Sequence, residues 1–171
     1  MRTGMVLLAA LVALVGCAAK EDPNDLSLGE EVGTLRASID GVLKVFSVEK
    51  HSTSSDCSYY YNTSNPSDGA LRVTGYLDEE KLNLFLGTPV AGTTWSSEQY
   101  HYLEYAATYD NAATERSSQN PGGSASMTLA TFGGVEGQEV TGTFLGTLTF
   151  ASGGQAVSVS GGQFTCTLSV N

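Results

Sequence analysis

Apolar and polar residues alternate with a period of two along most of the chain after residue 33. The clearest example is residues 34–46, where Asp40-Gly41 separates two alternating segments. Asp-Gly between such segments is typical of a two-residue type I′ turn. We therefore predict a β-hairpin with one buried face, which is apolar except for Lys44. The opposed positions are Leu35 with Phe46, Ala37 with Lys44, and Ile39 with Val42.

The same period predicts strands in several later segments, separated by stretches rich in Gly, Pro, Ser and Asn. These strands are 57–61, 71–77, 82–86, 99–108, 124–132 and 141–150, followed by two segments near the C-terminus. The segment 87–98 is predicted to be a loop, and 109–123 a long polar connection. No segment of the domain keeps a helical period of 3.6 residues. About eight or nine short strands predict an all-β fold, an antiparallel β-sandwich or a barrel-like sheet.

Two details of the C-terminal strands lead to specific expectations. Val157 and Val159 occupy odd positions, whereas Phe164 and Cys166 occupy even ones, so one straight strand cannot bury both pairs. We expect a bulge or turn at the glycine pair 161–162 to reset the phase. In 141–150, predicted to be the longest strand, two glycines leave gaps on the inner face, and we expect a bulky side chain to fill them. These glycines are Gly142 and Gly146, and the candidates are Trp95 or a tyrosine.

The N-terminus has the pattern of an export signal. Arg2 precedes an apolar run at residues 5–15, which is too short to span about 30 Å of hydrocarbon. Residues 14–17 read Leu-Val-Gly-Cys, which resembles the lipobox of bacterial lipoproteins. The resemblance implies cleavage before Cys17 and a lipid on its sulfur. Because Ala18 rather than Asp follows, it also implies the outer membrane more than the inner membrane.

The predicted organisation therefore has three parts. Residues 1–16 are a lipoprotein signal peptide, 17–33 a lipidated N-terminus with a flexible acidic tether, and 34–171 the β-domain. An ordinary signal peptide with a coincidental cysteine is the alternative to lipidation.

Two cysteines remain in the domain. Cys57 and Cys166 are each in phase with apolar or aromatic neighbours, so both sulfurs can point into the same interior. Outside the cytoplasm such a pair usually forms a disulfide. Two buried free thiols are the alternative.

Charge and motifs exclude several functions. The chain has 8 Lys and Arg against 18 Asp and Glu, a formal net charge of -10, which is unfavourable for nucleic-acid binding. No zinc-binding, nucleophile-elbow or nucleotide-binding motif is present, so we expect no enzyme activity, cofactor or metal. The acidic run 78–80 is interpreted as a solvated turn.

Aromatic residues are the best candidates for a binding surface. Exposed rings on a β-domain can stack on a sugar or on a partner's side chains, although core packing is the more common role. The candidates are Tyr59, Tyr60, Tyr61, Trp95, Tyr100 and Tyr102.

Three short motifs resemble small domains of unknown function in bacterial lipoproteins. They are Ile-Asp-Gly at 39–41, Gly-Thr-Phe-Leu-Gly at 142–146 and Gly-Gln-Phe at 162–164. The resemblance implies a β-rich fold and no assigned chemistry. From the sequence we expect a non-enzymatic, lipid-anchored envelope protein that binds or scaffolds a protein partner. The alternative is a module that binds polysaccharide through its Tyr and Trp residues.

Overall fold

The computed structural model describes residues 33–48, 56–60, 69–97, 100–109 and 111–171. The predictions for the signal peptide, Cys17 and nearly all of the tether fall outside these residues, as does Tyr61. In the described part of the chain, no helix has the length and apolar character needed to cross a bilayer.

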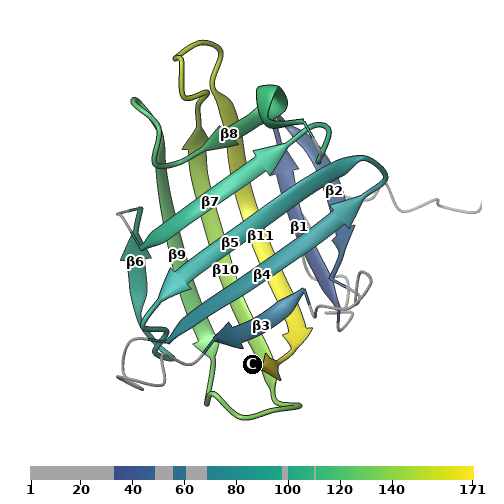
Figure 1. Cartoon of the computed structure of the whole chain (residues 1–171), viewed down its shortest axis with the longest axis vertical. Helices are drawn as coiled ribbons and strands as arrows, with labels where there is room; N and C mark the ends of the chain where they lie inside the picture. Colours follow the sequence, from purple (N-terminus) through teal and green to yellow (C-terminus); the bar gives the residue numbers. More distant parts are fainter. Residues whose placement is uncertain (1–32, 49–55, 61–68, 98–99, 110) are drawn as a thin grey trace, which may run out of the picture.

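The described chain is all-β, and its strands belong to one curled sheet of twelve strands (Figure 1). The expected count of eight or nine is wrong, mainly because three strands have only two or three residues. A 3-10 turn, η2, covers Ala112–Thr114. The strands are β1 (Thr34–Ile39), β2 (Val42–Ser47), β3 (Cys57–Tyr60), β4 (Ala70–Leu77), β5 (Glu80–Gly87), β6 (Thr94–Ser96), β7 (His101–Ala106), β8 (Glu115–Ser117), β9 (Ser124–Thr131), β10 (Glu139–Leu148), β11 (Val157–Thr167) and β12 (Ser169–Val170).

The sheet folds over itself into two layers. The strand order is β6-β9-β10-β11-β1-β2-β4-β5-β7-β8, and β3 pairs with both β4 and β12. In Figure 1, β3, β4, β5 and β7 cross in front of β9, β10 and β11. All pairings are antiparallel except the one between β12 and β3. The architecture is therefore an antiparallel half-barrel, in broad agreement with the expected fold class.

Backbone junctions join the two layers, including one between β2 and β4 and one at β8. Between β2 and β4 one registered pair, Ser47 with Tyr76, lies within the described residues. At the other end of the strand order, Ser117 of β8 forms an antiparallel bridge with Thr149, just beyond β10. There the Ser117 amide donates to the Thr149 carbonyl at 2.9 Å, and the Thr149 amide donates back at 3.2 Å. The bridge brings β8 against the layer that contains β10.

The predicted hairpin at residues 34–46 is confirmed. β1 and β2 pair in the expected register around Asp40-Gly41, both of which have the positive φ that a type I′ turn requires. Leu35, Ala37 and Phe46 are fully buried, whereas Val42 at the hairpin end is 60% exposed. β4 and β5 form the second hairpin, whose turn is shorter than expected because Glu80 already pairs with Leu77.

The expected phase reset in β11 is also confirmed. Phe144 opposes Gly162 and Gly146 opposes Val159, so β11 has one extra residue between these pairs. The register with β1 shifts in the same place. Because of this bulge, Val157 and Val159 share the buried side with Phe164 and Cys166. β11, with 11 residues, is the longest strand, which corrects the expectation for 141–150.

The glycine gaps on β10 are filled differently from our expectation. A Cβ on Gly142 would lie 2.6 Å from the Phe164 ring, and a Cβ on Gly146 would lie 2.5 Å from the Ser124 carbonyl oxygen. Neither Trp95 nor a tyrosine fills these gaps. A phenylalanine from the paired strand and the close backbone of β9 occupy the space instead.

Lys44, the one charged residue on the buried face of the hairpin, has a partner on the opposite layer. Its ammonium lies 2.5 Å from Glu80 Oε1, and the Tyr105 hydroxyl donates to Glu80 Oε2 at 2.9 Å. Glu80 therefore faces inward, while Asp78 and Glu79 remain in the exposed turn. This pair satisfies a cation that would otherwise face apolar side chains.

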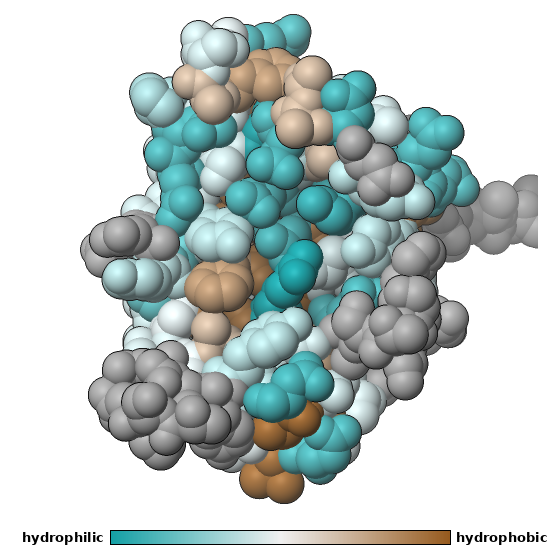
Figure 2. All heavy atoms as spheres, in the orientation of Figure 1, coloured by the Kyte–Doolittle hydropathy of each residue, from teal (hydrophilic) through white to brown (hydrophobic). Residues whose placement is uncertain are grey.

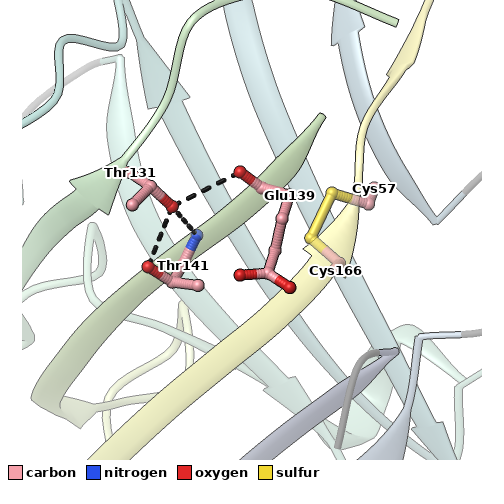
Figure 3. Close-up of a disulfide and its surroundings, with 5 residues drawn as sticks. All are labelled: Cys57, Thr131, Glu139, Thr141 and Cys166. Atoms are coloured by element: carbon pink, nitrogen blue, oxygen red, sulfur yellow. Dashed lines mark hydrogen bonds between the residues drawn. A yellow bond between two sulfur atoms is a disulfide. The ribbon is translucent and has the colours of Figure 1, made fainter. Parts of the chain in front are cut away.

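Cys57 and Cys166 form a disulfide between β3 and β11 (Figure 3). Their Cα atoms are 6.1 Å apart, and both side chains are about 1% exposed. Nearby, the Thr131 hydroxyl accepts a hydrogen bond from the Thr141 amide at 2.9 Å. The disulfide connects the two layers across 109 residues of sequence.

Removing this disulfide should destabilise the domain substantially. For a closed loop near 100 residues, the chain-entropy model gives up to about 4.7 kcal/mol. We expect the double variant Cys57→Ala, Cys166→Ala to lose about 2–5 kcal/mol in urea denaturation, and reductant to have the same effect on the parent chain. The Cys17→Ser chain serves as control, because it should keep both its stability and its response to reductant. Equal denaturation midpoints with and without reductant would contradict the prediction.

Candidate functional site

The aromatic candidates do not form one platform. Tyr59 is a core residue: its ring lies edge-on to Phe132, with centroids 5.2 Å apart, and it occupies the space beside Gly69. Tyr60, the next residue on β3, is 40% exposed. Tyr61 lies outside the described residues.

Trp95 belongs to β6 and not to the loop that we expected. It opposes Met127 of β9, is half-buried, and packs against the hydrophobic core. Its ring centroid lies 5.8 Å from that of His101. Packing within the sheet therefore occupies much of this side chain.

Two of the candidates do lie together on the outer face of the front layer. On β7, Leu103 and Tyr105 are buried, whereas Tyr102 and Glu104 point the other way. Tyr102 stacks on Phe85 of β5 with ring centroids 5.0 Å apart and planes 7° apart. Tyr100, just before β7, is 64% exposed. We call Phe85, Tyr100 and Tyr102 the β7 aromatic patch.

A polar network continues the same face beyond the aromatic patch. Asn83 on β5 accepts hydrogen bonds at Oδ1 from Thr74 Oγ1 at 3.0 Å and from Arg72 Nε at 3.3 Å. Its Nδ2 donates to Glu104 Oε2 at 3.1 Å. Thr74 and Asn83 are only 1% and 3% exposed. The network therefore holds one carboxylate oxygen of Glu104 in a fixed position.

The environment of Glu104 raises its pKa above the ordinary value of 4.5. Burial is the main cause, and the negative charge of Glu115 acts in the same direction, while the Asn83 hydrogen bond and the charges of Lys81 and Arg72 oppose it. Glu115 is close because β7 pairs with β8. Glu104 opposes Ser117 and Ala106 opposes Glu115, so the two glutamates are diagonal neighbours on one face.

Both glutamates line a cavity of about 440 Å³ at the place where β8 meets the end of β10. We call it the seam cavity. Figure 2 shows hydrophilic side chains gathered over this upper part of the front face, around β7 and β8. The described lining residues are Glu104, Ala112, Ala113, Glu115, Ser117, Gln119, Asn120, Phe150, Ala151 and Ser152.

The lining of the seam cavity includes several acceptor atoms that make no hydrogen bond to the described residues. Asn120 Nδ2 donates to the Thr149 carbonyl at 2.7 Å, which leaves Asn120 Oδ1 available. Glu104 Oε2 is bonded to Asn83, which leaves Oε1. The Glu115 carboxylate accepts no hydrogen bond from the described residues. The cavity thus presents negative charge and lone pairs to whatever enters it.

A second hollow, of about 200 Å³, lies on the other layer and has a different character. Its described lining contains no charged residue and comprises Ser126, Thr128, Thr143, Phe144, Leu145, Gly161, Gly162 and Gln163. Within the described residues, no group of three or more His, Cys, Asp or Glu side chains could hold a metal ion.

Comparison with known proteins adds no assignment. No known protein family, curated protein or solved structure matches the chain. The site must therefore be interpreted from its own chemistry.

The sequence pattern missed the residues that surround Glu104. The alternation along 99–108 does place Glu104 on the same face as Tyr100 and Tyr102. Glu115, however, belonged to the predicted polar connection 109–123, and a three-residue strand such as β8 has too few positions to show alternation. Only the pairing of β8 with β7 reveals that the two carboxylates are neighbours.

The raised pKa of Glu104 leads to a pH-dependent prediction. Because the folded state favours its protonated form, its contribution to stability is greatest below a pH of about 4.5 and is lost as pH rises through the folded pKa. Glu104→Gln stays neutral and can still accept the Asn83 hydrogen bond. We therefore expect the stability of this variant relative to the parent chain to increase from about pH 4 to pH 7, measured by thermal unfolding.

Glu139→Gln is the matched control for this experiment. Glu139 is exposed at the opposite end of β10, so the same loss of charge should leave the pH profile close to that of the parent chain. A stability difference between Glu104→Gln and the parent that does not change with pH would contradict the prediction.

Proposed function

We propose that the chain is a lipid-anchored, non-enzymatic protein of the cell envelope whose β-domain binds or scaffolds a partner. The observation that best supports this proposal is the buried Cys57–Cys166 disulfide. Disulfides persist in oxidising compartments outside the cytoplasm, to which a signal peptide such as 1–16 directs a chain. The lipobox pattern at 14–17 and Ala18 after the cysteine support attachment to the outer membrane.

The proposed anchor needs no spanning helix. Each buried CH₂ contributes about 0.8 kcal/mol, and one acyl chain alone binds a membrane only marginally. Two or three chains on Cys17 give lasting attachment. The acidic segment 17–33 then separates the β-domain from the anionic membrane surface by charge repulsion and by its length.

Lipidation of Cys17 can be tested directly. The full-length gene product, expressed in a bacterium with lipoprotein processing, should incorporate labelled palmitate and lose residues 1–16, as measured by mass spectrometry. Cys17→Ser should remove the label and move the chain from the membrane fraction to the soluble fraction. The double variant Cys57→Ala, Cys166→Ala should still carry the label, which separates lipidation from any other thiol chemistry. An unmodified Cys17 with residues 1–16 still attached would refute the anchor.

Carbohydrate binding is the second candidate, and the β7 aromatic patch favours it. Tyr102 and Phe85 present a stacked pair on the outer face, and Tyr100 beside them is largely exposed. Aromatic rings stack on the apolar faces of sugars, and the neighbouring polar groups of Arg72 and Glu104 can bond hydroxyls. The candidate surface is narrower than the sequence implied, because Tyr59 is buried in the core and Trp95 packs against it.

This candidate predicts a response to polysaccharide that depends on Tyr102. A glycan array followed by titration should identify a ligand, and Tyr102→Ala should weaken it about 2- to 10-fold through the lost ring contact. Tyr109→Ala removes another exposed ring outside the patch and should leave affinity unchanged. The carbohydrate role is refuted by an array with no bound glycan, or by equal effects of the two substitutions.

A further inference from the structure

We propose that the seam cavity binds a small organic cation, which presents a protonated amine or a guanidinium group to Glu104 and Glu115. This inference rests on the binding role proposed above but is independent of the lipid anchor. The cavity shares Glu104 with the surroundings of the β7 aromatic patch but contains none of its rings, because neither Phe85, Tyr100 nor Tyr102 lines it.

The dimensions of the cavity suit a small molecule. Its volume of about 440 Å³ lies within the range of about 300–1,000 Å³ that is usual for ligand pockets. Its walls come from β7, η2, β8, residues 119–120 and the turn after β10. The Ser117–Thr149 bridge links β8 to the segment after β10, and so joins two of these walls.

The hydrogen-bonding groups of the cavity favour a donor. Glu104 Oε1, the Glu115 carboxylate and Asn120 Oδ1 can all accept, and one of the two amide hydrogens of Asn120 is already bonded to the Thr149 carbonyl. An ammonium or guanidinium group has donors and no acceptor, so it complements this set. Hydrogen bonds between such a cation and a carboxylate are about twice as strong as neutral ones.

The charge balance points in the same direction. No Lys or Arg is among the described lining residues. The nearby Arg116 lies over the Phe150 ring, with its guanidinium 4.0 Å from the ring centroid, and donates to the Thr114 carbonyl. In the described part of the chain neither carboxylate forms an ion pair, and Lys81 and Arg72 act on Glu104 only through charges that lie farther away. The mutual repulsion of the two carboxylates also contributes to the raised pKa of Glu104.

The apolar part of the lining supplies the other half of an amine site. Phe150, Ala112, Ala113 and Ala151 provide surface for the hydrocarbon part of a ligand. The contact with Arg116 already shows a cation over the Phe150 ring. A divalent metal ion would make no favourable contact with this apolar surface. A neutral sugar would leave the negative charges of both carboxylates without a cation.

The test compares two probes with the same four-carbon chain, one with charged ammonium groups and one with neutral hydroxyl groups. Calorimetric titration of the purified full chain with 1,4-diaminobutane should give saturable binding that weakens as salt increases, whereas 1,4-butanediol should not bind. Agmatine tests the guanidinium group in the same way. Glu115→Gln and Glu104→Gln should each weaken diamine binding at least about tenfold through loss of a charge-assisted hydrogen bond. Glu139→Gln should leave it unchanged.

Several results would overturn the proposal. One is the absence of saturable binding of either amine at millimolar concentration, and another is equal binding of the diol. A third is a loss of diamine affinity in Glu139→Gln equal to that in the cavity variants, which would indicate attraction to the acidic chain as a whole. Displacement of the diamine by calcium chloride at equal concentration would assign the site to a metal ion instead. Circular dichroism and melting temperature show whether each variant is folded, and Glu115→Asp, which keeps the charge, should retain binding if the fold is intact.

Failure of this test can be distinguished from failure of the proposed function. The palmitate label reports on Cys17, and the glycan titration reports on Tyr102, so both results stand whatever the amine titration gives. A polysaccharide that binds with unchanged affinity in Glu115→Gln but weakly in Tyr102→Ala would place carbohydrate on the aromatic patch alone.

Discussion

The disulfide between Cys57 and Cys166 is the covalent constraint on which the two-layer arrangement depends. It joins the short strand β3 in the front layer to the longest strand, β11, in the back layer. β3 has only four residues and pairs with β4 and with two residues of β12. Such a short strand makes few hydrogen bonds of its own, so the buried sulfur bridge adds a covalent link between the layers to the β3–β12 pairing and the Ser117–Thr149 bridge. The interior between them is then filled by leucines from β4, β5 and β7 facing Phe144, Phe164 and Val140.

Local sequence signals predicted the parts of this fold that depend on neighbours along the chain. Asp40-Gly41 determined a hairpin register, and the change from odd to even apolar positions located the bulge of β11. The short strands β6, β8 and β12 were not predictable in this way, because two or three residues cannot establish a period. The filling of the Gly142 gap also depended on a partner strand, since Phe164 is 22 residues away in sequence.

The same distinction applies to the functional surface. Alternation correctly placed Tyr100, Tyr102 and Glu104 on one face of β7. It gave no information about Phe85, Asn83 and Glu115, which reach that face through the pairing of β5, β7 and β8. A candidate list based on aromatic residues alone therefore included a core residue, Tyr59, and omitted the carboxylates. In an acidic chain, the sequence alone does not distinguish a functional glutamate from a solvated one. The distinction requires the fold, which shows which glutamates share a partly buried surface.

The single registered pair between β2 and β4 has a mechanical consequence. Among the described residues, this line has fewer registered pairs than any other pair of neighbours in the strand order, so opening the sheet here breaks few of the backbone hydrogen bonds described. The Lys44–Glu80 ion pair and the contact of Phe46 with Gly75 are the main side-chain ties that remain. The disulfide and the Ser117–Thr149 bridge restrain the layers elsewhere, so we expect local opening of the half-barrel to occur along the β2–β4 line. Local openings of this kind cost less than global unfolding, and an opening along this line would uncover Phe46, which is fully buried in the closed sheet.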